Sequence, residues 1–155
     1  MKRLAAILLG LLWALTLAGA AQEELRIITL RLSPKQDLKK ELQALVEREK
    51  LEAGFIMTTV GSLSTLKLRL AGQENTTTYS GPFEIVSLAG TLSPQGLHLH
   101  LSASDSDGRT LGGHLVDGNL IYTTAEIVIG VPTKLRYRRV LDPASGFPEL
   151  KVETK

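Results

Sequence analysis

All three histidines of this sequence (His98, His100 and His114) fall within residues 97–115. Histidine is the commonest metal-binding side chain, and neutral imidazoles suit Zn²⁺ and similar divalent ions. Residues 97–101 alternate leucine and histidine, so a strand there places His98 and His100 on one face and the leucines on the other. Three protein ligands with an open fourth position are typical of catalytic zinc sites. The pattern therefore indicates a divalent metal site, with zinc the expected ion, provided that His114 joins the other two histidines.

The turn that follows decides where His114 lies. The sequence Asp-Ser-Asp-Gly at residues 105–108 is typical of a turn. A three-residue loop (residues 106–108) with its glycine left-handed sets His100 directly opposite His114, with Cβ atoms about 5 Å apart. A two- or four-residue loop moves His114 to the opposite face unless a bulge corrects the register. The Gly112–Gly113 pair suits such a bulge, or close approach of the backbone to a ligand. From the residues alone, a histidine face that is solvated or packed against another subunit stays open as the alternative.

Two glutamates, Glu84 and Glu126, are candidate catalytic residues. Glu84 lies in an expected strand over residues 83–88 and shares its face with Val86 and Leu88. A carboxylate among apolar neighbours is costly unless it is hydrogen-bonded, paired or bound to a ligand. Each glutamate is therefore either a structural residue bonded to backbone or arginine, or a partner of a histidine or general base beside a metal-bound water. A hydrolase requires one of them within hydrogen-bond reach of that water.

Residues 1–20 have the pattern of a secretory signal peptide. Lys2 and Arg3 precede an apolar run over residues 4–17, and Ala-Gly-Ala at residues 18–20 supplies the small residues of a cleavage site. The apolar run is shorter than the span of about 20 residues that a membrane helix requires. We therefore expect export to the periplasm or the exterior, with no membrane anchor after cleavage. The chain has no cysteine, so disulfides do not stabilise it.

Cleavage also changes the charge balance. The full chain carries 18 Lys+Arg and 16 Asp+Glu, and removal of Lys2 and Arg3 leaves 16 of each. Residues 21–155 thus have a formal net charge of zero and the length of one compact domain. A neutral chain gives no electrostatic indication of nucleic-acid binding.

The remaining pattern predicts one helix among many strands. After a strand over residues 24–32, Ser33 as N-cap, Pro34 as the first helical residue and Gln36 in a capping box predict a helix start. Its apolar stripe has helical spacing and comprises Leu38, Leu42, Leu45, Val46 and Leu51.

Strands are expected over residues 55–60, 66–70, 83–88, 97–101, 109–116, 119–129 and 134–140, with a polar loop over 73–80 and a short tail over 148–152. Lys134, Arg136 and Arg138 alternate along one strand with Arg139 beside them, which suits an edge strand protected by charge or a contact with phosphates.

Several motifs resemble the PPC domain, the plants and prokaryotes conserved domain. Residues 81–88 are similar to its Gly-Arg-Phe-Glu-Ile-Leu segment, with Pro82 in place of the arginine. Arg-Leu-Ser-Pro at residues 31–34 resembles the opening of the domain, although Lys35 stands where a glycine is common. The other matching motifs follow in the order of prokaryotic members: residues 90–92, 98–100, 107–108, 112–115 and 124–126. The resemblance covers residues 21–155.

This resemblance implies an α/β (α+β) fold with a largely antiparallel sheet and few helices, assembled as a homotrimer. Prokaryotic members with this histidine pattern are similar to proteins that carry a bound metal. Plant members pair the domain with an AT-hook centred on Arg-Gly-Arg-Pro, and no such core exists here.

The leading hypothesis is an exported homotrimer that binds a divalent metal through His98, His100 and His114, with no reaction specified. The alternatives are a non-enzymatic DNA- or protein-binding module and a metal-assisted hydrolase that uses Glu84 or Glu126.

Overall fold

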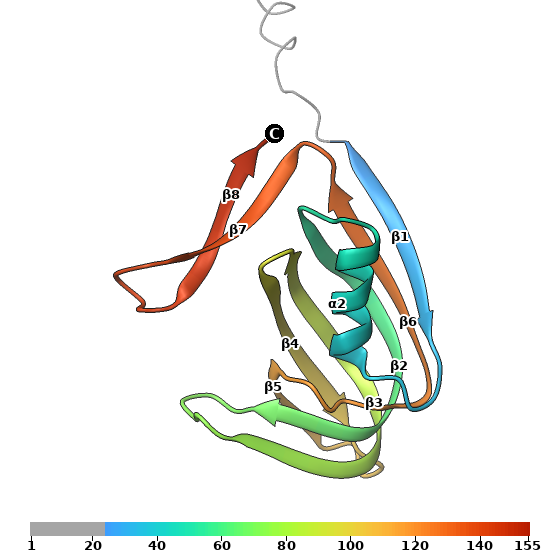
Figure 1. Ribbon diagram of the computed structural model, residues 1–155. Helices are drawn as coiled ribbons and strands as arrows, with labels where there is room; N and C mark the ends of the chain where they lie inside the picture. The colour runs from blue at the N-terminus through green and yellow to red at the C-terminus, as the bar shows by residue number, and fades with distance from the viewer. Residues whose placement is uncertain (1–23) are drawn as a thin grey trace, which may run out of the picture.

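The structure, a computed structural model, describes residues 24–155, which form one helix and eight strands (Figure 1). In chain order these elements are β1 (Leu25–Leu32), α2 (Leu38–Arg48), β2 (Gly54–Arg69), β3 (Thr76–Ser93), β4 (Gly96–Ser104), β5 (Thr110–Leu115), β6 (Ile121–Pro132), β7 (Leu135–Leu141) and β8 (Pro148–Thr154). The expected antiparallel sheet with one amphipathic helix is confirmed. The expected signal peptide, residues 1–20, lies outside the described residues. Within residues 24–155, no helix combines the length and apolar character needed to cross a membrane.

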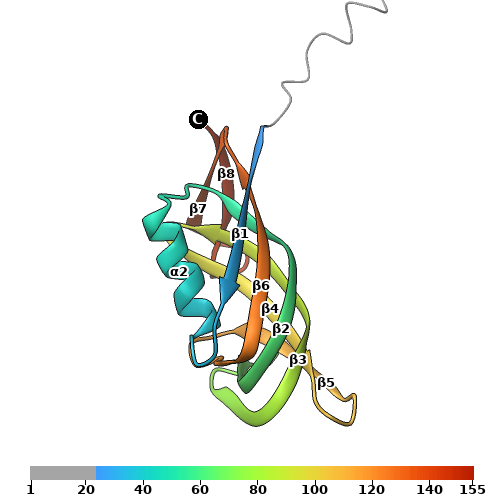
Figure 2. The same cartoon turned by 90° about the vertical axis from the view of Figure 1, so that its right-hand side faces the viewer.

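Six strands form an antiparallel sheet in the order β1-β6-β2-β3-β4-β5, and part of this sheet closes on itself. β2 and β3 are long, so each changes neighbours along its length. The first part of β2 pairs with β6, whereas its last two residues, Leu68 and Arg69, pair with β5. Register shifts over residues 63–65 and 85–87 mark irregularities at which such strands bend. Figure 2 shows the long bent strands from the side.

Three sequence expectations about the strands are wrong in their extent. Residues 55–60 and 66–69 belong to one strand, β2, and Leu70 lies just after it. Residues 76–80, expected in a polar loop, begin β3 and pair with residues 65–69 of β2. The expected tail is the strand β8, paired with β7. Threonine has high β propensity, so a threonine-rich segment forms a strand when a partner strand lies beside it.

The helix α2 begins after Asp37, four residues later than the sequence pattern predicts. Asp37 Oδ1 accepts hydrogen bonds from the backbone N–H groups of Lys39 and Lys40 at 3.1 and 3.3 Å, as an N-cap does. The Gln36 side chain does accept a hydrogen bond from the Ser33 N–H at 2.6 Å, but the left-handed backbone of Lys35 (φ 72°) prevents a helix from starting at residue 34. The predicted apolar stripe is confirmed: its members are buried where α2 covers one face of the sheet (Figure 1).

Asn119 is completely buried and joins three parts of the fold. Its amide accepts from the Lys67 N–H at 2.8 Å and donates to the carbonyls of Lys67 and Val116 at 2.8 and 2.7 Å. Its own carbonyl accepts from the N–H of Leu38, the first residue of α2, at 2.9 Å. Asn119 thereby fixes the end of β5 beside β2 and the start of the helix.

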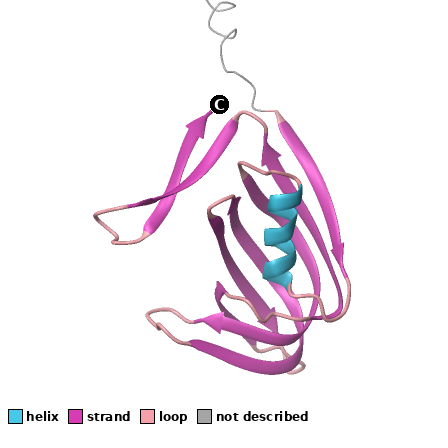
Figure 3. Cartoon of the chain, viewed as in Figure 1, coloured by secondary structure: helices cyan, strands magenta, loops and turns pink. Residues whose placement is uncertain are grey.

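The β7–β8 hairpin stands apart from the main sheet and is held at its base by Glu52 (Figure 3). Arg136 on β7 lies 3.0 Å from one carboxylate oxygen of Glu52, and Lys155 after β8 lies 3.1 Å from the other. The hydrogen bond from Lys155, together with Arg136, lowers the pKa of the Glu52 carboxyl. The Glu52 carbonyl also accepts from the Tyr137 N–H at 2.9 Å. One residue therefore orients both strands of the hairpin.

We expect Asn119→Ala to lower the free energy of unfolding by about 2–4 kcal/mol, because it leaves partly buried backbone groups of Lys67 and Val116 without partners. Denaturant unfolding measures the change. Asn75→Ala, at an exposed position, is the control and should change stability by less than about 0.5 kcal/mol. Equal effects of the two substitutions would contradict this role for Asn119.

Candidate metal centre

The three histidines come from neighbouring strands, and the hairpin between those strands has the register of the three-residue loop, one of the alternatives that the sequence left open. His100 on β4 lies directly opposite His114 on β5. The loop consists of residues 106–108, with Gly108 left-handed at φ 78°. Asp105 stabilises the loop, because its Oδ1 accepts from the N–H groups of Asp107 and Arg109 at 2.9 and 3.0 Å. The three-residue loop is therefore confirmed as the feature that places His114 on the face of the other two histidines.

The Gly112–Gly113 pair forms no bulge, and the β4–β5 register continues through it without a shift. A Cβ atom on Gly113 would lie 2.9 Å from the carbonyl oxygen of Arg69. The missing side chain lets β5 approach the backbone of β2 rather than a ligand. This approach pairs His114 with Arg69 across the two strands.

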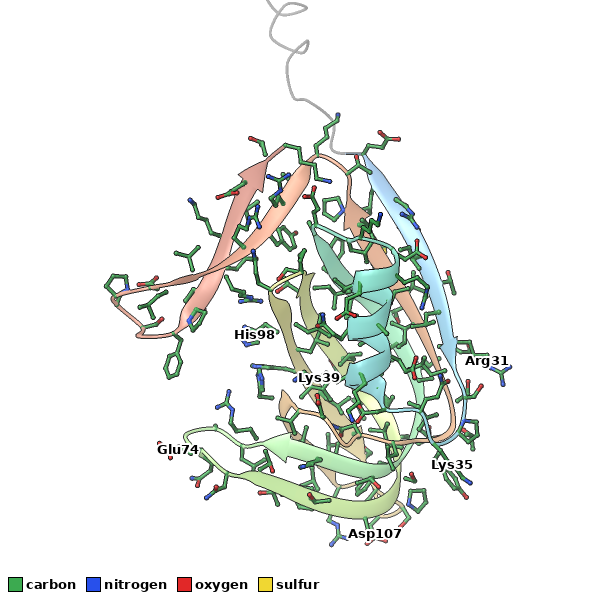
Figure 4. The ribbon with its side chains drawn as sticks, viewed as in Figure 1. Arg31, Lys35, Lys39, Glu74, His98 and Asp107 are labelled. Carbon is green, nitrogen blue, oxygen red and sulfur yellow. The ribbon has the colours of Figure 1, made fainter. Side chains whose placement is uncertain are left out.

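The three imidazoles form a compact cluster. Their ring centroids are separated by 5.2 Å (His98–His100), 5.3 Å (His98–His114) and 5.7 Å (His100–His114). One ring nitrogen from each histidine lies within 4.8 Å of the other two. Figure 4 shows His98 extending from β4 toward the space beside the β7–β8 hairpin. Two adjacent strands, β4 and β5, therefore supply all three converging side chains.

The environment keeps two of these rings neutral. Burial, followed by the positive charge of Arg69, lowers the pKa of His114 from 6.5 to about 4. Burial, followed by the charge of Arg139, also lowers the pKa of His98. A neutral imidazole has a free nitrogen lone pair, and this is the form that binds metals.

The residues present fit a tetrahedral metal ion. Zn–N bonds of about 2.0–2.1 Å need ligand nitrogens about 3.4 Å apart, so three nitrogens already within 4.8 Å require only small ring rotations. Nδ1 of His114 is buried and has no hydrogen-bond partner in the described part of the chain. An orphaned imidazole nitrogen is the kind of atom that a ligand satisfies. The cluster therefore has the composition and spacing to hold a metal ion.

Neither candidate glutamate reaches the cluster, and both are exposed. The register shift over residues 85–87 leaves Glu84 and Val86 in solvent and returns Leu88 to the core, so the expected apolar surroundings of Glu84 do not form. Glu84 pairs with Ser104, four residues along β4 from His100, or about 13 Å. Glu126 lies on β6, three strand spacings from β4, or about 14 Å.

Sequence reasoning missed the charged residues around the cluster. Arg139 on β7 lies 3.4 Å from Nδ1 of His98 and donates to the hydroxyl of Thr91 at 2.6 Å. Glu149 on β8 lines the pockets on both sides of His98. The one available signal was that Arg139 breaks the alternation of Lys134, Arg136 and Arg138. The proximity of Arg139 to His98 depends on the contacts that anchor the hairpin. These contacts join segments far apart in the chain, so a local sequence pattern does not predict them.

With the fold and the cluster described, comparison with known proteins decides the family. The sequence profile of the Plants and Prokaryotes Conserved (PCC) domain, also written PPC, matches residues 19–132. The chain belongs to this family. The matched region contains all three histidines, and β7 and β8 follow it.

Two solved structures share the fold of this PPC chain. A hypothetical protein from Salmonella cholerae-suis (Salmonella enterica) has a TM-score of 0.85 and 41% identity, covering 88% of this chain and 99% of that one. A metal-containing protein from Archaeoglobus fulgidus has a TM-score of 0.72 and 21% identity, covering 86% and 99%.

A curated relative is much longer. Bifunctional protein GlmU from Synechococcus sp. (strain JA-3-3Ab) is 50% identical over 129 residues, which make up 83% of this chain and 21% of that protein. The chain thus spans about a fifth of the length of the curated relatives that it matches.

The lowered pKa of His114 predicts a specific loss of stability in acid. Below pH 6.5 the unfolded chain protonates this histidine, whereas the native protein does so only near pH 4. Between these values the unfolded state binds more protons, so the contribution of His114 to native stability falls as the pH drops from 6.5 to 4 and is constant below that.

As the pH falls from 6.5 to 4, we expect metal-free wild type to lose more unfolding free energy than the His114→Gln variant, which has no titrating ring at this position. Denaturant unfolding at several pH values measures it, and NMR titration of the ring gives the native pKa. A His114 ring that titrates near 6.5 would contradict the lowering of its pKa by burial and Arg69.

Proposed function

We propose that this PPC protein binds a divalent metal ion, with zinc the expected ion, through His98, His100 and His114. The observation that carries the proposal is the cluster itself, in which three imidazole nitrogens converge within 4.8 Å. Nitrogen ligands and neutral rings suit Zn²⁺. The metal-containing protein from Archaeoglobus fulgidus, which has the same fold, adds support. A zinc ion held by three histidines would have an open position and would supply a Lewis acid there.

We assign no reaction to the site. A hydrolytic mechanism requires a base within hydrogen-bond reach of a metal-bound water, and Glu84 and Glu126 lie too far from the cluster. A DNA-binding role also has little support, since residues 21–155 carry no net charge. Arg136 and Arg138 of the basic stripe pair with Glu52 and Glu153 instead of remaining available for phosphates.

The proposed setting is an exported homotrimer. The signal-peptide pattern at residues 1–20 supports export, and N-terminal sequencing of the protein recovered from its host tests it. Self-association is supported by exposed apolar residues on the β7–β8 hairpin, because monomers seldom leave such side chains grouped in water. By the strand register, Leu141, Leu150 and Val152 share one face of the hairpin; Val140 lies on the other face and Phe147 in the connecting turn.

We expect about one zinc ion per chain in mature protein purified without a histidine tag, and loss of that zinc in the double variant His98→Ala, His100→Ala. Elemental analysis after zinc loading and desalting measures the ratio. Glu84→Gln, on the same outer face about 13 Å away, is the matched control and should retain the metal. Absence of zinc from the loaded wild type, or its retention in the double variant, would refute the proposal.

We expect light scattering coupled to size-exclusion chromatography to give the mass of three chains for the wild type. The double variant Leu141→Asp, Val152→Asp should dissociate to single chains, because it puts charge into the proposed contact. Lys151→Asp is the control, since this residue points to the opposite face of β8 from Val152. A wild type that is monomeric, or a double variant that remains trimeric, would count against the proposed assembly.

A further inference from the structure

A pocket of about 410 Å³ lies against the histidine cluster and is partly covered by the β7–β8 hairpin. The residues that line it include His98, His114, Arg69 and Arg139. Its volume is within the range of sites that hold small molecules, about 300–1,000 Å³. The pocket therefore combines an opening onto the proposed metal with two fixed positive charges.

Neither arginine is neutralised by a carboxylate in the described part of the chain. Arg69 makes no ion pair or side-chain hydrogen bond there, and the guanidinium group of Arg139 contacts Thr91 and His98. By contrast, Arg136 and Arg138 on the same strand as Arg139 pair with glutamates. These two guanidinium groups beside one pocket have no acidic partner, so an anionic ligand would supply the hydrogen-bond acceptors and the negative charge that they lack.

We propose that Arg69 and Arg139 form a carboxylate-binding subsite beside the histidine cluster, and that the ligand is a small carboxylic acid with an apolar body. This inference rests on the proposed function in one respect, because it assigns the ligand class of that same site. Arg69 and Arg139 lie on β2 and β7, whereas the histidines lie on β4 and β5.

The pocket lining selects this class of anion. An arginine fork matches a carboxylate with two parallel hydrogen bonds. The apolar side chains of Leu97, Phe147 and Pro148 line the same pocket and give the rest of the ligand a surface on which to pack. Glu149 also lines it and accepts from the Ser145 hydroxyl at 2.9 Å. Inorganic phosphate has no apolar body to pack on these side chains, so the lining favours a carboxylic acid over phosphate.

The contact between Arg139 and His98 also couples this ligand to the metal. A guanidinium only donates hydrogen bonds, so at 3.4 Å it uses the lone pair of Nδ1, and the proton of the neutral ring then lies on Nε2. A metal ion that takes the lone pair of Nδ1 must therefore displace Arg139 from His98. A carboxylate that accepts from Arg139 draws it away from His98, so metal and carboxylate should strengthen each other's binding by the same factor.

The test is calorimetric titration of the purified mature protein, metal-free and zinc-loaded, with sodium benzoate as the probe. Benzamide, which has the same shape and no charge, is the matched ligand control, and inorganic phosphate is the competing anion. The variants are Arg69→Met and Arg139→Met, with Arg138→Met as the control from the same strand. Arg69→Lys and Arg139→Lys, which keep the charge and lose the fork, serve if a methionine variant fails to fold.

We expect benzoate to bind about tenfold or more tightly than benzamide, and each methionine variant to lose about tenfold in benzoate affinity while Arg138→Met does not. The lysine variants should lose less. Zinc loading should strengthen benzoate binding in the wild type. Equal binding of benzoate and benzamide, unchanged affinity in both sets of variants, or tighter binding of phosphate than of benzoate would overturn the inference. Zinc content, measured on the same samples, shows separately whether the proposed metal site exists.

Discussion

The candidate site depends on the position of β5, which pairs with β4 on one side and with the end of β2 on the other. The three-residue loop fixes the first pairing and sets His114 opposite His100. The second pairing requires Gly113, because a side chain there would collide with the carbonyl of Arg69. Asn119 then holds the end of β5 through hydrogen bonds to Lys67 and Val116. Because both edges of β5 are paired, the histidine cluster lies on a rigid part of the sheet and not on a free loop.

The β7–β8 hairpin contributes the charged surroundings of this cluster. Its base is held by Glu52 through Arg136 and Lys155, and its far part brings Arg139 to His98. Such exposed ion pairs are individually weak, and the hydrogen bonds from Tyr137 to Glu52 and from Arg139 to Thr91 add to them. The histidines and Arg69 thus belong to the main sheet, whereas Arg139 belongs to the hairpin. A ligand that contacts both would order the hairpin against the sheet.

The sequence was sufficient to predict features governed by local geometry. Period-two alternation predicted the shared face of His98 and His100. Turn chemistry left a few registers open for His114, and the three-residue loop is the one that forms. The sequence was insufficient where tertiary pairing decides the outcome. The helix starts at Asp37 because left-handed Lys35 precedes it, and the register shift near Val86 exposes Glu84, which periodicity alone places among apolar residues. The closeness of Arg69 and Arg139 to the cluster depends on contacts between segments far apart in the chain, so no spacing rule predicts it.

The central claim is that three imidazoles on β4 and β5 form one metal site. Anomalous diffraction from crystals of the zinc-loaded protein, recorded on both sides of the zinc absorption edge, tests it most directly. The account predicts one strong anomalous peak per chain, within about 2.0–2.1 Å of a ring nitrogen of each of His98, His100 and His114. Crystals of zinc-loaded protein with no peak at this cluster, or with the ion bound by other residues, would contradict it.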